Sequence, residues 1–384
     1  MASSTESWSG RTTLMVAHCA GMIDLVALPV WVGTLIARYK LEPQQAGALA
    51  TAFLIGAVVS SLFFAPRFNR LNARAAATCG FGAAALAFAA ATRVSDFAYL
   101  AALHGLAGAA AGCALSFTHG AIASSTNPHR LFAMVGMALG VFAIVFLGTT
   151  PNLVAEFGGA ALFATFAGVM AVATVFSLIS FPAMATGRKS DPVAEVNRLP
   201  SAVWFGVAGV SCMALTQAMM FSFMERIGVD RGFGTEAVTG VLIAIGFVNL
   251  FPAPLAAALE GRLPARAVML AGPVCQTAIA LAITFGQGFL AYAIPASIFV
   301  AVMIFTHTFA FGLLSRLDPS ARALAGTPAM LMTGAAIGPI LGGTLVQSFG
   351  YQALGIGAVA ISLAAIGLFS RVHTTQTTAA SQAA

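Results

Sequence analysis

The stretch Arg70-Leu71-Asn72-Ala73-Arg74-Ala75 decides the architecture, because it returns as Arg262-Leu263-Pro264-Ala265-Arg266-Ala267. The two copies lie 192 positions apart, which is half of the 384-residue chain, and each stands between two long apolar runs. The same shift carries Phe157-Gly158 onto Phe349-Gly350. Internal repeats of this kind set the architecture of a chain. The sequence therefore predicts two homologous halves.

The composition excludes an ordinary soluble protein. Hydrophobic residues make up 59% of the chain and charged residues only 8%, whereas soluble domains carry about 25% charged residues. Backbone polar groups inside hydrocarbon must pair within their own segment, so long apolar runs there are expected to be helices. The predicted fold class is an all-α membrane protein with twelve transmembrane helices in two six-helix, pseudo-symmetric halves. The twelve runs lie near 12–36, 44–65, 75–92, 97–122, 131–152, 158–183, 200–224, 236–258, 267–286, 288–314, 323–347 and 351–370.

The longest polar interruption divides the chain. We expect an N-terminal half at 1–183, a cytoplasmic linker at 184–199, a C-terminal half at 200–371 and a disordered tail at 372–384. With both termini in the cytoplasm, 13 of the 18 Lys and Arg residues fall on cytoplasmic segments and 5 on outer ones. This distribution obeys the positive-inside rule for a multi-pass protein of the cytoplasmic (inner) membrane. The basic excess thus serves topology and does not indicate a nucleic-acid partner.

Asp24 is the carboxylate that lies deepest in a predicted span, about halfway along 12–36. An acid at the bilayer centre costs about 2.5–3.5 kcal/mol on insertion scales, and such residues are usually functional. Pro29 removes a hydrogen bond to the Leu25 carbonyl and predicts a bend beside the acid. We predict that Asp24 carries a coupling proton or faces a cationic or donor-rich solute. The alternative is a structural hydrogen bond between helices.

Four histidines and a glutamine mark every third helix of the predicted bundle. This spacing favours a shared cavity lined by runs 1, 4, 7 and 10, while interhelical hydrogen bonding is the structural alternative. No two histidines have the i, i+4 spacing of a metal pair, and the five cysteines are dispersed, so we expect no metal, no cofactor and no disulfide framework. The cavity residues predicted with Asp24 are His18, His104, His119, Gln217 and His307.

Glycines recur at four-residue spacing within three runs, which predicts close helix packing and smooth faces over which the halves could slide. The stripes are Gly108/Gly112, Gly136/Gly140 and Gly334/Gly338/Gly342.

The whole chain resembles the major facilitator superfamily of secondary transporters. The family carries a turn after its second helix that reads roughly Gly-x-x-x-Asp-Arg-x-Gly-Arg-Arg/Lys. Arg70 and Arg74 match the family's arginine and its final basic position, whereas Asn69 and Asn72 stand in place of the family Asp and Gly. The second copy keeps both basic positions, as Arg262 and Arg266. The resemblance implies that these four arginines form a cytoplasmic gate by pairing with acids or helix C-termini.

A second motif departs from the family. Many members carry Arg-x-x-x-Gly in the fourth helix, linked to proton coupling, where this chain reads His104-Gly105-Leu106-Ala107-Gly108. His104 would then have to replace the arginine by titrating itself. The resemblance also implies two halves that rock about a central solute site.

These features predict a proton-coupled secondary transporter of a small organic solute, working as a monomer in the lipid bilayer. No Gly-x-x-x-x-Gly-Lys-Ser/Thr signature is present, which leaves an ion gradient as the energy source. With no Lys or Arg in mid-membrane, we expect a neutral, amphiphilic or cationic solute. A lone helix-1 acid resembles the multidrug antiporters and favours export. Uptake by symport, a non-transporting sensor and a membrane-embedded enzyme are the alternatives, and an enzyme lacks the clustered catalytic groups it would need.

Overall fold

The computed structural model describes residues 5–64, 67, 70–182, 200–317 and 327–372. Within these ranges all regular secondary structure is helical, as the sequence predicts. Eleven helical stretches are long and apolar enough to cross a membrane by length and composition, and α15 is a further helix of 23 residues. The N-terminal helices are α1 Trp8–Gly21, α2 Ile23–Tyr39, α3 Pro43–Phe64, α4 Ala73–Ala91, α5 Phe97–Ala123, α6 Pro128–Phe157 and α7 Ala160–Ser180.

The second half repeats this order with shorter pieces. Its first two spans are each divided in two, so that α8 with α9 and α10 with α11 each cover one predicted run. Gly288 has a φ of 85°, and the short break there separates the ninth and tenth spans. The helices are α8 Ser201–Ser222, α9 Met224–Asp230, α10 Thr235–Val248, α11 Pro252–Leu259, α12 Ala265–Phe285, α13 Phe289–Leu317, α15 Thr327–Phe349 and α16 Gln352–Ser370.

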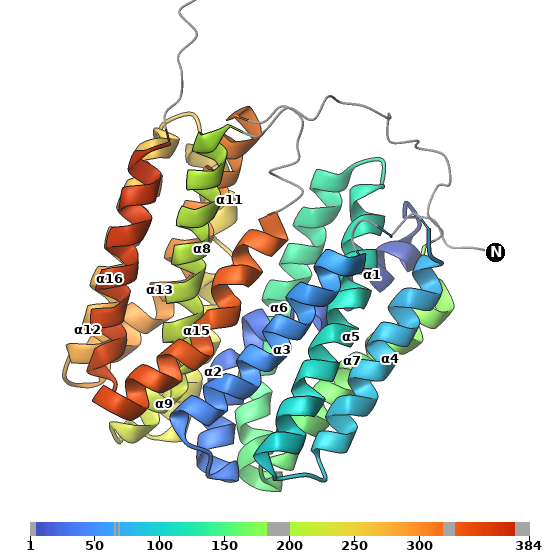
Figure 1. Ribbon diagram of the computed structural model, residues 1–384, viewed down its shortest axis with the longest axis horizontal. Coiled ribbons are helices and arrows are strands. Elements are labelled where there is room, and N and C mark those ends of the chain that lie inside the picture. Colours follow the sequence, from blue (N-terminus) through green and yellow to red (C-terminus); the bar gives the residue numbers. More distant parts are fainter. Residues whose placement is uncertain (1–4, 65–66, 68–69, 183–199, 318–326, 373–384) are drawn as a thin grey trace, which may run out of the picture.

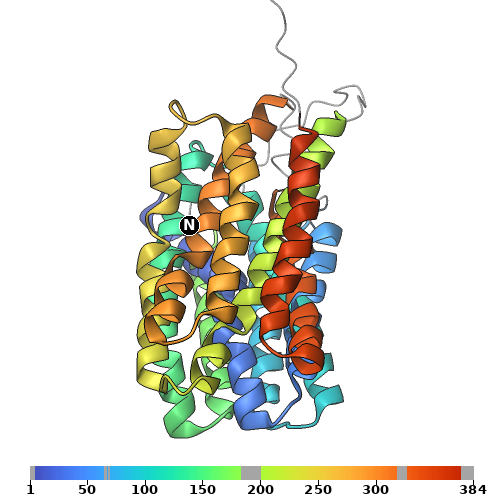
Figure 2. The same ribbon diagram turned by 90° about the vertical axis from the view of Figure 1, so that its left-hand side faces the viewer.

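The helices form two bundles that lie side by side (Figure 1; Figure 2 gives the view from the side). In the N-terminal bundle α5 packs between α3 and α4, and α4 packs on α7. In the C-terminal bundle α8 packs on α15 and α16, and α12 packs on α13 and α16. The two bundles touch through α3 with α15, α6 with α10, and α2 with α8 and α9.

The first and seventh spans are the most buried of the eleven, with 78% and 67% of their apolar windows inside the protein. Both spans therefore lie at the centre, where the bundles face each other. A polar side chain on either span is held away from lipid and close to the other half. The tenth span, which was expected to line the cavity, is buried to only 33%, the same share as the sixth.

The bundles are joined at one end of the molecule by the segments 43–51 of α3 and 339–347 of α15, which we call the seam. A Cβ atom on Gly47 would lie within 3.0 Å of the Pro339 carbonyl oxygen, so only glycine allows this approach. The Ile340 N–H donates to Thr51 Oγ1 at 3.2 Å, and the Gln44 N–H donates to a side-chain oxygen of Gln347 at 3.2 Å. The seam therefore closes this end with backbone contacts and hydrogen bonds.

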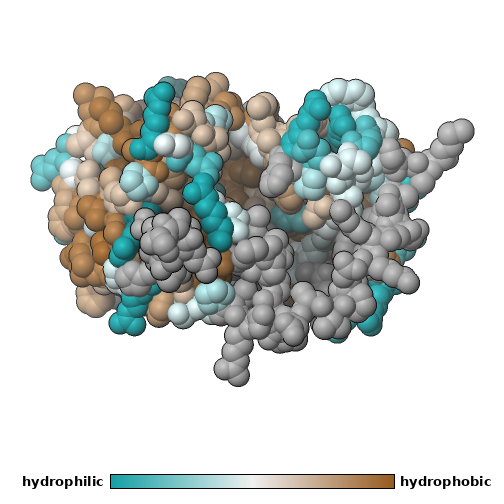
Figure 3. Space-filling view, turned by 90° about the horizontal axis from the view of Figure 1, so that it is seen from above, coloured by the Kyte–Doolittle hydropathy of each residue, from teal (hydrophilic) through white to brown (hydrophobic). Residues whose placement is uncertain are grey.

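The opposite end of the molecule carries the basic turns, and we call it the basic face. The two bundles diverge toward it (Figure 1). Seen from that side, the surface shows two masses of side chains with a hollow between them (Figure 3). The structure is thus a state that is closed at the seam and parted at the basic face.

Two of the three glycine stripes pack within a bundle, which confirms the packing prediction for them. A Cβ on Gly108 or Gly112 would lie within 3.0 Å of the carbonyl oxygens of Phe53 or Ala57 in α3. On α15, Gly334, Gly338 and Gly342 are equally tight against α8 and Phe223. The third stripe differs, because Gly136 has nothing within 4 Å and Gly140 meets Leu250 of the other bundle.

Substituting Gly108 with alanine is expected to lower stability by about 1–3 kcal/mol, the usual cost of overpacking. The added methyl would meet the backbone of Phe53, which cannot rotate away as a side chain can. Gly105→Ala is the matched control, since it lies on the same helix with nothing within 4 Å. Thermal unfolding of the purified protein measures both. A Gly108→Ala protein as stable as the Gly105→Ala protein would contradict the close packing of α5 on α3.

Candidate functional site

Asp24 lies at a break in the first span. Helix α1 ends at Gly21, Met22 leaves helical geometry with φ −108° and ψ 23°, and α2 begins at Ile23. Asp24 is therefore in the first turn of α2, where the positive end of the helix dipole favours an acid. Its side chain is 1% exposed, and among the described residues its Oδ1 has no hydrogen-bond partner.

The break at Met22 is a feature that the sequence analysis missed, because Pro29 predicts only a bend. Helix α2 continues through Pro29, and the interruption lies seven residues earlier, at Met22. A proline can sit inside a helix when the loss of one hydrogen bond is absorbed locally. Gly21 explains the actual position, because a Cβ there would lie 2.7 Å from Leu115 Cδ1 of α5, so the chain passes close to α5 just before it breaks.

His18 and His119 form a pair between α1 and α5. His18 Nδ1 lies 3.1 Å from His119 Nε2, and their ring centroids are 5.2 Å apart. In the neutral pair one ring nitrogen donates and the other accepts, so each tautomer depends on the other. The structure thus brings together two of the predicted cavity residues, from the first and fourth spans.

His104 is held in a different environment, inside the N-terminal bundle. It is fully buried, its Nδ1–H donates to the Leu100 carbonyl at 2.6 Å, and its Nε2 accepts from Trp31 Nε1 at 3.1 Å. Both ring nitrogens are therefore used, and the imidazole is neutral. The rings of Phe88 and Phe163 pack edge-on against it. His104 therefore stands at the position of the family arginine with both ring nitrogens bonded within the N-terminal bundle.

In the C-terminal bundle Gln217 lies beside Gln276 of α12. A side-chain N–H of Gln276 donates to the Met213 carbonyl at 3.2 Å and approaches Gln217 Oε1 at 3.4 Å. Gln276 is fully buried, and its Oε1 has no partner among the described residues. Sequence reasoning missed this residue, although a glutamine amid the apolar run 267–286 was a visible signal.

His307 lies apart from these groups on α13. Its ring packs on Phe311 with centroids 4.9 Å apart, and its Nδ1 is buried without a partner among the described residues. The preceding Thr306 donates to the Val302 carbonyl, as Thr118 donates to the Ala114 carbonyl in α5. The segments Phe117-Thr118-His119 and Phe305-Thr306-His307 therefore share the backbone bond of their threonines but not the environment of their histidines.

Glu225 is a second, half-buried acid that the sequence analysis missed. It lies in the first turn of α9, directly after a break at Phe223 with φ −107° and ψ 4°. Its Oε2 is buried without a hydrogen-bond partner among the described residues. The expected seventh run stops at 224, because the charges after it look like a loop. The structure corrects this boundary, since the seventh span continues to Asp230.

The basic turns bind helix ends within their own halves. Arg74 Nη2 donates to the Phe181 carbonyl at 3.0 Å, at the end of α7. Arg266 Nη2 donates to the Ser370 carbonyl at 2.9 Å, at the end of α16. Cations at helix C-termini are favoured by the dipole. Arg70 and Arg262 are exposed. In this state Arg74 and Arg266 each bind a helix end of their own half, and neither forms a hydrogen bond to the described residues of the other half.

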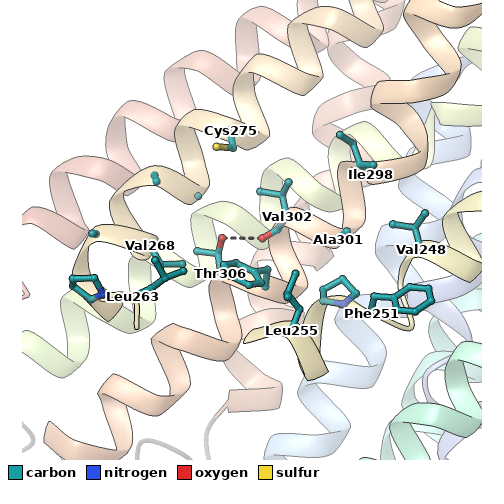
Figure 4. Close-up of a pocket in the computed structure, with 16 residues that line it drawn as sticks. Val248, Phe251, Leu255, Leu263, Val268, Cys275, Ile298, Ala301, Val302 and Thr306 are labelled. Carbon is teal, nitrogen blue, oxygen red and sulfur yellow. Dashed lines mark hydrogen bonds between the residues drawn. The ribbon is translucent and has the colours of Figure 1, made fainter. Parts of the chain in front are cut away.

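A cavity of about 610 Å³ lies on the flank of the C-terminal bundle, between α10–α11, α12 and α13 (Figure 4). Its wall is apolar, with Phe251, Leu255 and Ile298 among its lining residues, and the Thr306 hydroxyl is turned back to Val302. It contains none of the predicted site residues. This chemistry suits a hydrocarbon chain and does not suit a polar solute. In the described ranges no group of three His, Cys, Asp or Glu side chains could hold a metal ion.

Comparison with known proteins agrees with this architecture. Solved structures similar to the chain include the nucleoside transporter NupG, with a TM-score of 0.74 and 13% identity over 94% of this chain and 98% of that one. A D-xylose-proton symporter gives a TM-score of 0.76 at 13% identity, over 96% of this chain and 99% of that one. Comparison with curated proteins gives no significant match. The model of the Major Facilitator Superfamily matches residues 13–322. The chain therefore belongs to the Major Facilitator Superfamily, as a multi-pass membrane transporter and not an enzyme.

Proposed function

We propose that this secondary transporter is driven by protons and that Asp24 binds the coupling proton. The observation that carries the proposal is a buried carboxylate with an unpartnered oxygen, at a break in the most buried span. Unwound helix breaks near the membrane centre are where transporters of several folds place solutes and ions. A carboxyl that exchanges a proton there would couple the rocking of the halves to a proton gradient.

We infer that the solute is a small neutral or cationic organic molecule with hydrogen-bonding groups. Two polar groups support this, the His18–His119 pair in the N-terminal half and the Gln217–Gln276 pair in the C-terminal half. These side chains donate and accept hydrogen bonds when neutral. Neither they nor Asp24 would offset the charge of an anion. His307 adds a third group with an unused nitrogen.

We place the basic face in the cytoplasm of a cell with an inner membrane, following the charge distribution. The structure would then be the cytoplasm-open state of a monomer with halves at 1–183 and 200–371. The linker 184–199 lies outside the described residues, as does the tail beyond Val372. Arg70, Arg74, Arg262 and Arg266 would close the cytoplasmic side in the other state.

Export by antiport is the direction we expect from the sequence, with uptake by symport as the alternative. The likeness to a D-xylose-proton symporter, at 13% identity, shows the fold and does not decide the direction. Both directions use the same proton site, so the sign of the proton movement separates them.

The test uses purified protein in vesicles that enclose a pH-sensitive dye. A thermal-stability screen of nucleosides, monosaccharides and amphiphilic cations first identifies a solute. When that solute is added outside, antiport raises the internal pH, because protons leave as solute enters. Symport lowers it. Solute entry with no change in internal pH would reject proton coupling altogether.

A further inference from the structure

The two halves share a feature that their sequences hide. In each, the central span breaks at one residue, Met22 or Phe223, with nearly the same backbone angles. In each, the second residue after the break is an acid, Asp24 or Glu225, in the first turn of the next helix. Each acid has a buried oxygen without a hydrogen-bond partner among the described residues. The two breaks are alike in local geometry but are not equivalent in the repeat, because α1 before the first break has 14 residues and α8 before the second has 22.

The second acid lies between the halves. A Cβ on Gly33 of α2 would lie within 3.0 Å of Glu225 Oε2, so this carboxylate rests against the bare backbone of the opposite half. A small cavity of about 120 Å³ adjoins it and is lined from both halves, by Thr34 and Arg38 of α2, Pro151 of α6 and Val229 of α9 among others. Glu225 is thus placed on the same side of the molecule as the seam.

Most charged groups around Glu225 are engaged elsewhere, although the Nε of the adjacent Arg226 is buried without a hydrogen-bond partner among the described residues. Arg226 pairs with Asp230 at 2.6 Å, and Asp230 also accepts from the Tyr351 hydroxyl. Arg38 donates to the Ala155 carbonyl at 3.3 Å. Burial, and then the hydrogen bond to Asp230, raise the pKa of Tyr351, which keeps this hydroxyl a donor.

The remaining neighbours are occupied in the same way. On α13 the Tyr292 hydroxyl donates to the Met224 carbonyl at 2.8 Å, and the Arg231 guanidinium donates to carbonyls at the end of α12. Glu236 at the start of α10 is exposed. No described cation therefore pairs with Glu225. An ionised carboxylate with one oxygen buried and without a partner, as Oε2 is here, is costly unless the group holds a proton.

We propose that Glu225 is a second proton-binding site, which keeps its proton while the seam is closed and releases it to the outer solution when the seam opens. Opening would separate Glu225 from Gly33 and admit water to the carboxyl, and the ionised form is then solvated. Acid on that side therefore holds the seam shut, and alkali favours opening. The inference rests on the proposed proton-driven function, but its readout is a conformation and needs no solute.

The experiment measures the width of the seam against pH. Spin labels are placed at Gln44 and Gln347, two exposed seam positions, after the five native cysteines are replaced by alanine, and the protein is held in lipid nanodiscs. In the labelled parent, the closed population is expected to fall as pH rises. Glu225→Gln, which has the same shape but no titration, should lose this response and stay closed at every pH.

Two further variants make the result decisive. Glu236→Gln removes an exposed acid on the same side and should respond to pH as the parent does. Asp24→Asn tests the proposed function in the transport assay, and its seam should still respond to pH. A pH-independent seam in the parent would overturn the inference, as would a Glu225→Gln seam that still responds. Either result leaves the transport assay of Asp24→Asn to decide the proposed function separately. Thermal unfolding checks that each variant is folded.

Discussion

Asp24→Asn is expected to abolish proton-driven accumulation of solute while exchange of solute across the membrane continues. Asparagine has the size and hydrogen-bonding reach of aspartate but cannot bind and release a proton. Asp24 has no partner at Oδ1 among the described residues, so the substitution breaks no bond of that oxygen. Exchange needs only the loaded protein to move between its two states, whereas accumulation needs a proton to be released on one side. Accumulation should fall to the level of protein-free vesicles.

The measurement compares two assays on the same vesicles, one with an imposed pH gradient and one with equal pH and labelled solute on one side. Asp96→Asn is the matched control. Asp96 caps α5 by accepting from the Ala98 and Tyr99 N–H groups, and asparagine caps a helix equally well. Accumulation by Asp24→Asn at the parental rate would remove Asp24 from the coupling mechanism. Loss of exchange as well would assign Asp24 to solute binding or folding.

Helix positions could be predicted from the sequence because hydrocarbon permits few alternatives. The fourth span, expected at 97–122, is Phe97–Ala123, and the twelfth, expected at 351–370, is Gln352–Ser370. Breaks within a span could not be predicted in this way. Met22 leaves helical geometry beside a glycine packed on Leu115, and such a contact is a property of the folded bundle that local sequence does not carry.

The candidate site was likewise predicted only in part. Asp24 stands out in any hydropathy profile, but Glu225 does not, because Arg226 and Asp230 follow it and form an ion pair along α9. That pair lets a polar helix extend the seventh span beyond the apolar run. His104 shows another feature that the local sequence does not carry. A histidine in an apolar helix looks functional, and only the positions of Trp31 and Leu100 reveal that both its nitrogens are engaged.

Gly47→Ala is expected to shift the conformational equilibrium away from the closed seam. The methyl would lie within 3.0 Å of the Pro339 carbonyl oxygen, a backbone atom of the opposite half, and this collision exists only while the seam is closed. Overpacking costs about 1–3 kcal/mol, which corresponds to a change of roughly 5- to 150-fold in the ratio of the two states. Gly343→Ala should act in the same direction from the other half, since its Cβ would meet the Pro43 carbonyl oxygen.

Labelling of a cysteine placed at Thr344 measures this shift, because Thr344 is half-buried beside Gln44 in the closed seam and becomes more accessible to water when the seam opens. A membrane-impermeant thiol reagent applied from that side should react faster in both glycine variants. Gly240→Ala is the control, on α10 with nothing within 4 Å. Equal labelling in Gly47→Ala and Gly240→Ala would mean that the seam stays closed in spite of the added methyl. If Gly47→Ala lowered thermal stability without faster labelling, the added methyl would collide with the opposite half in both states. Faster labelling at unchanged stability would instead show that the bare backbone at Gly47 is what allows the two halves to meet.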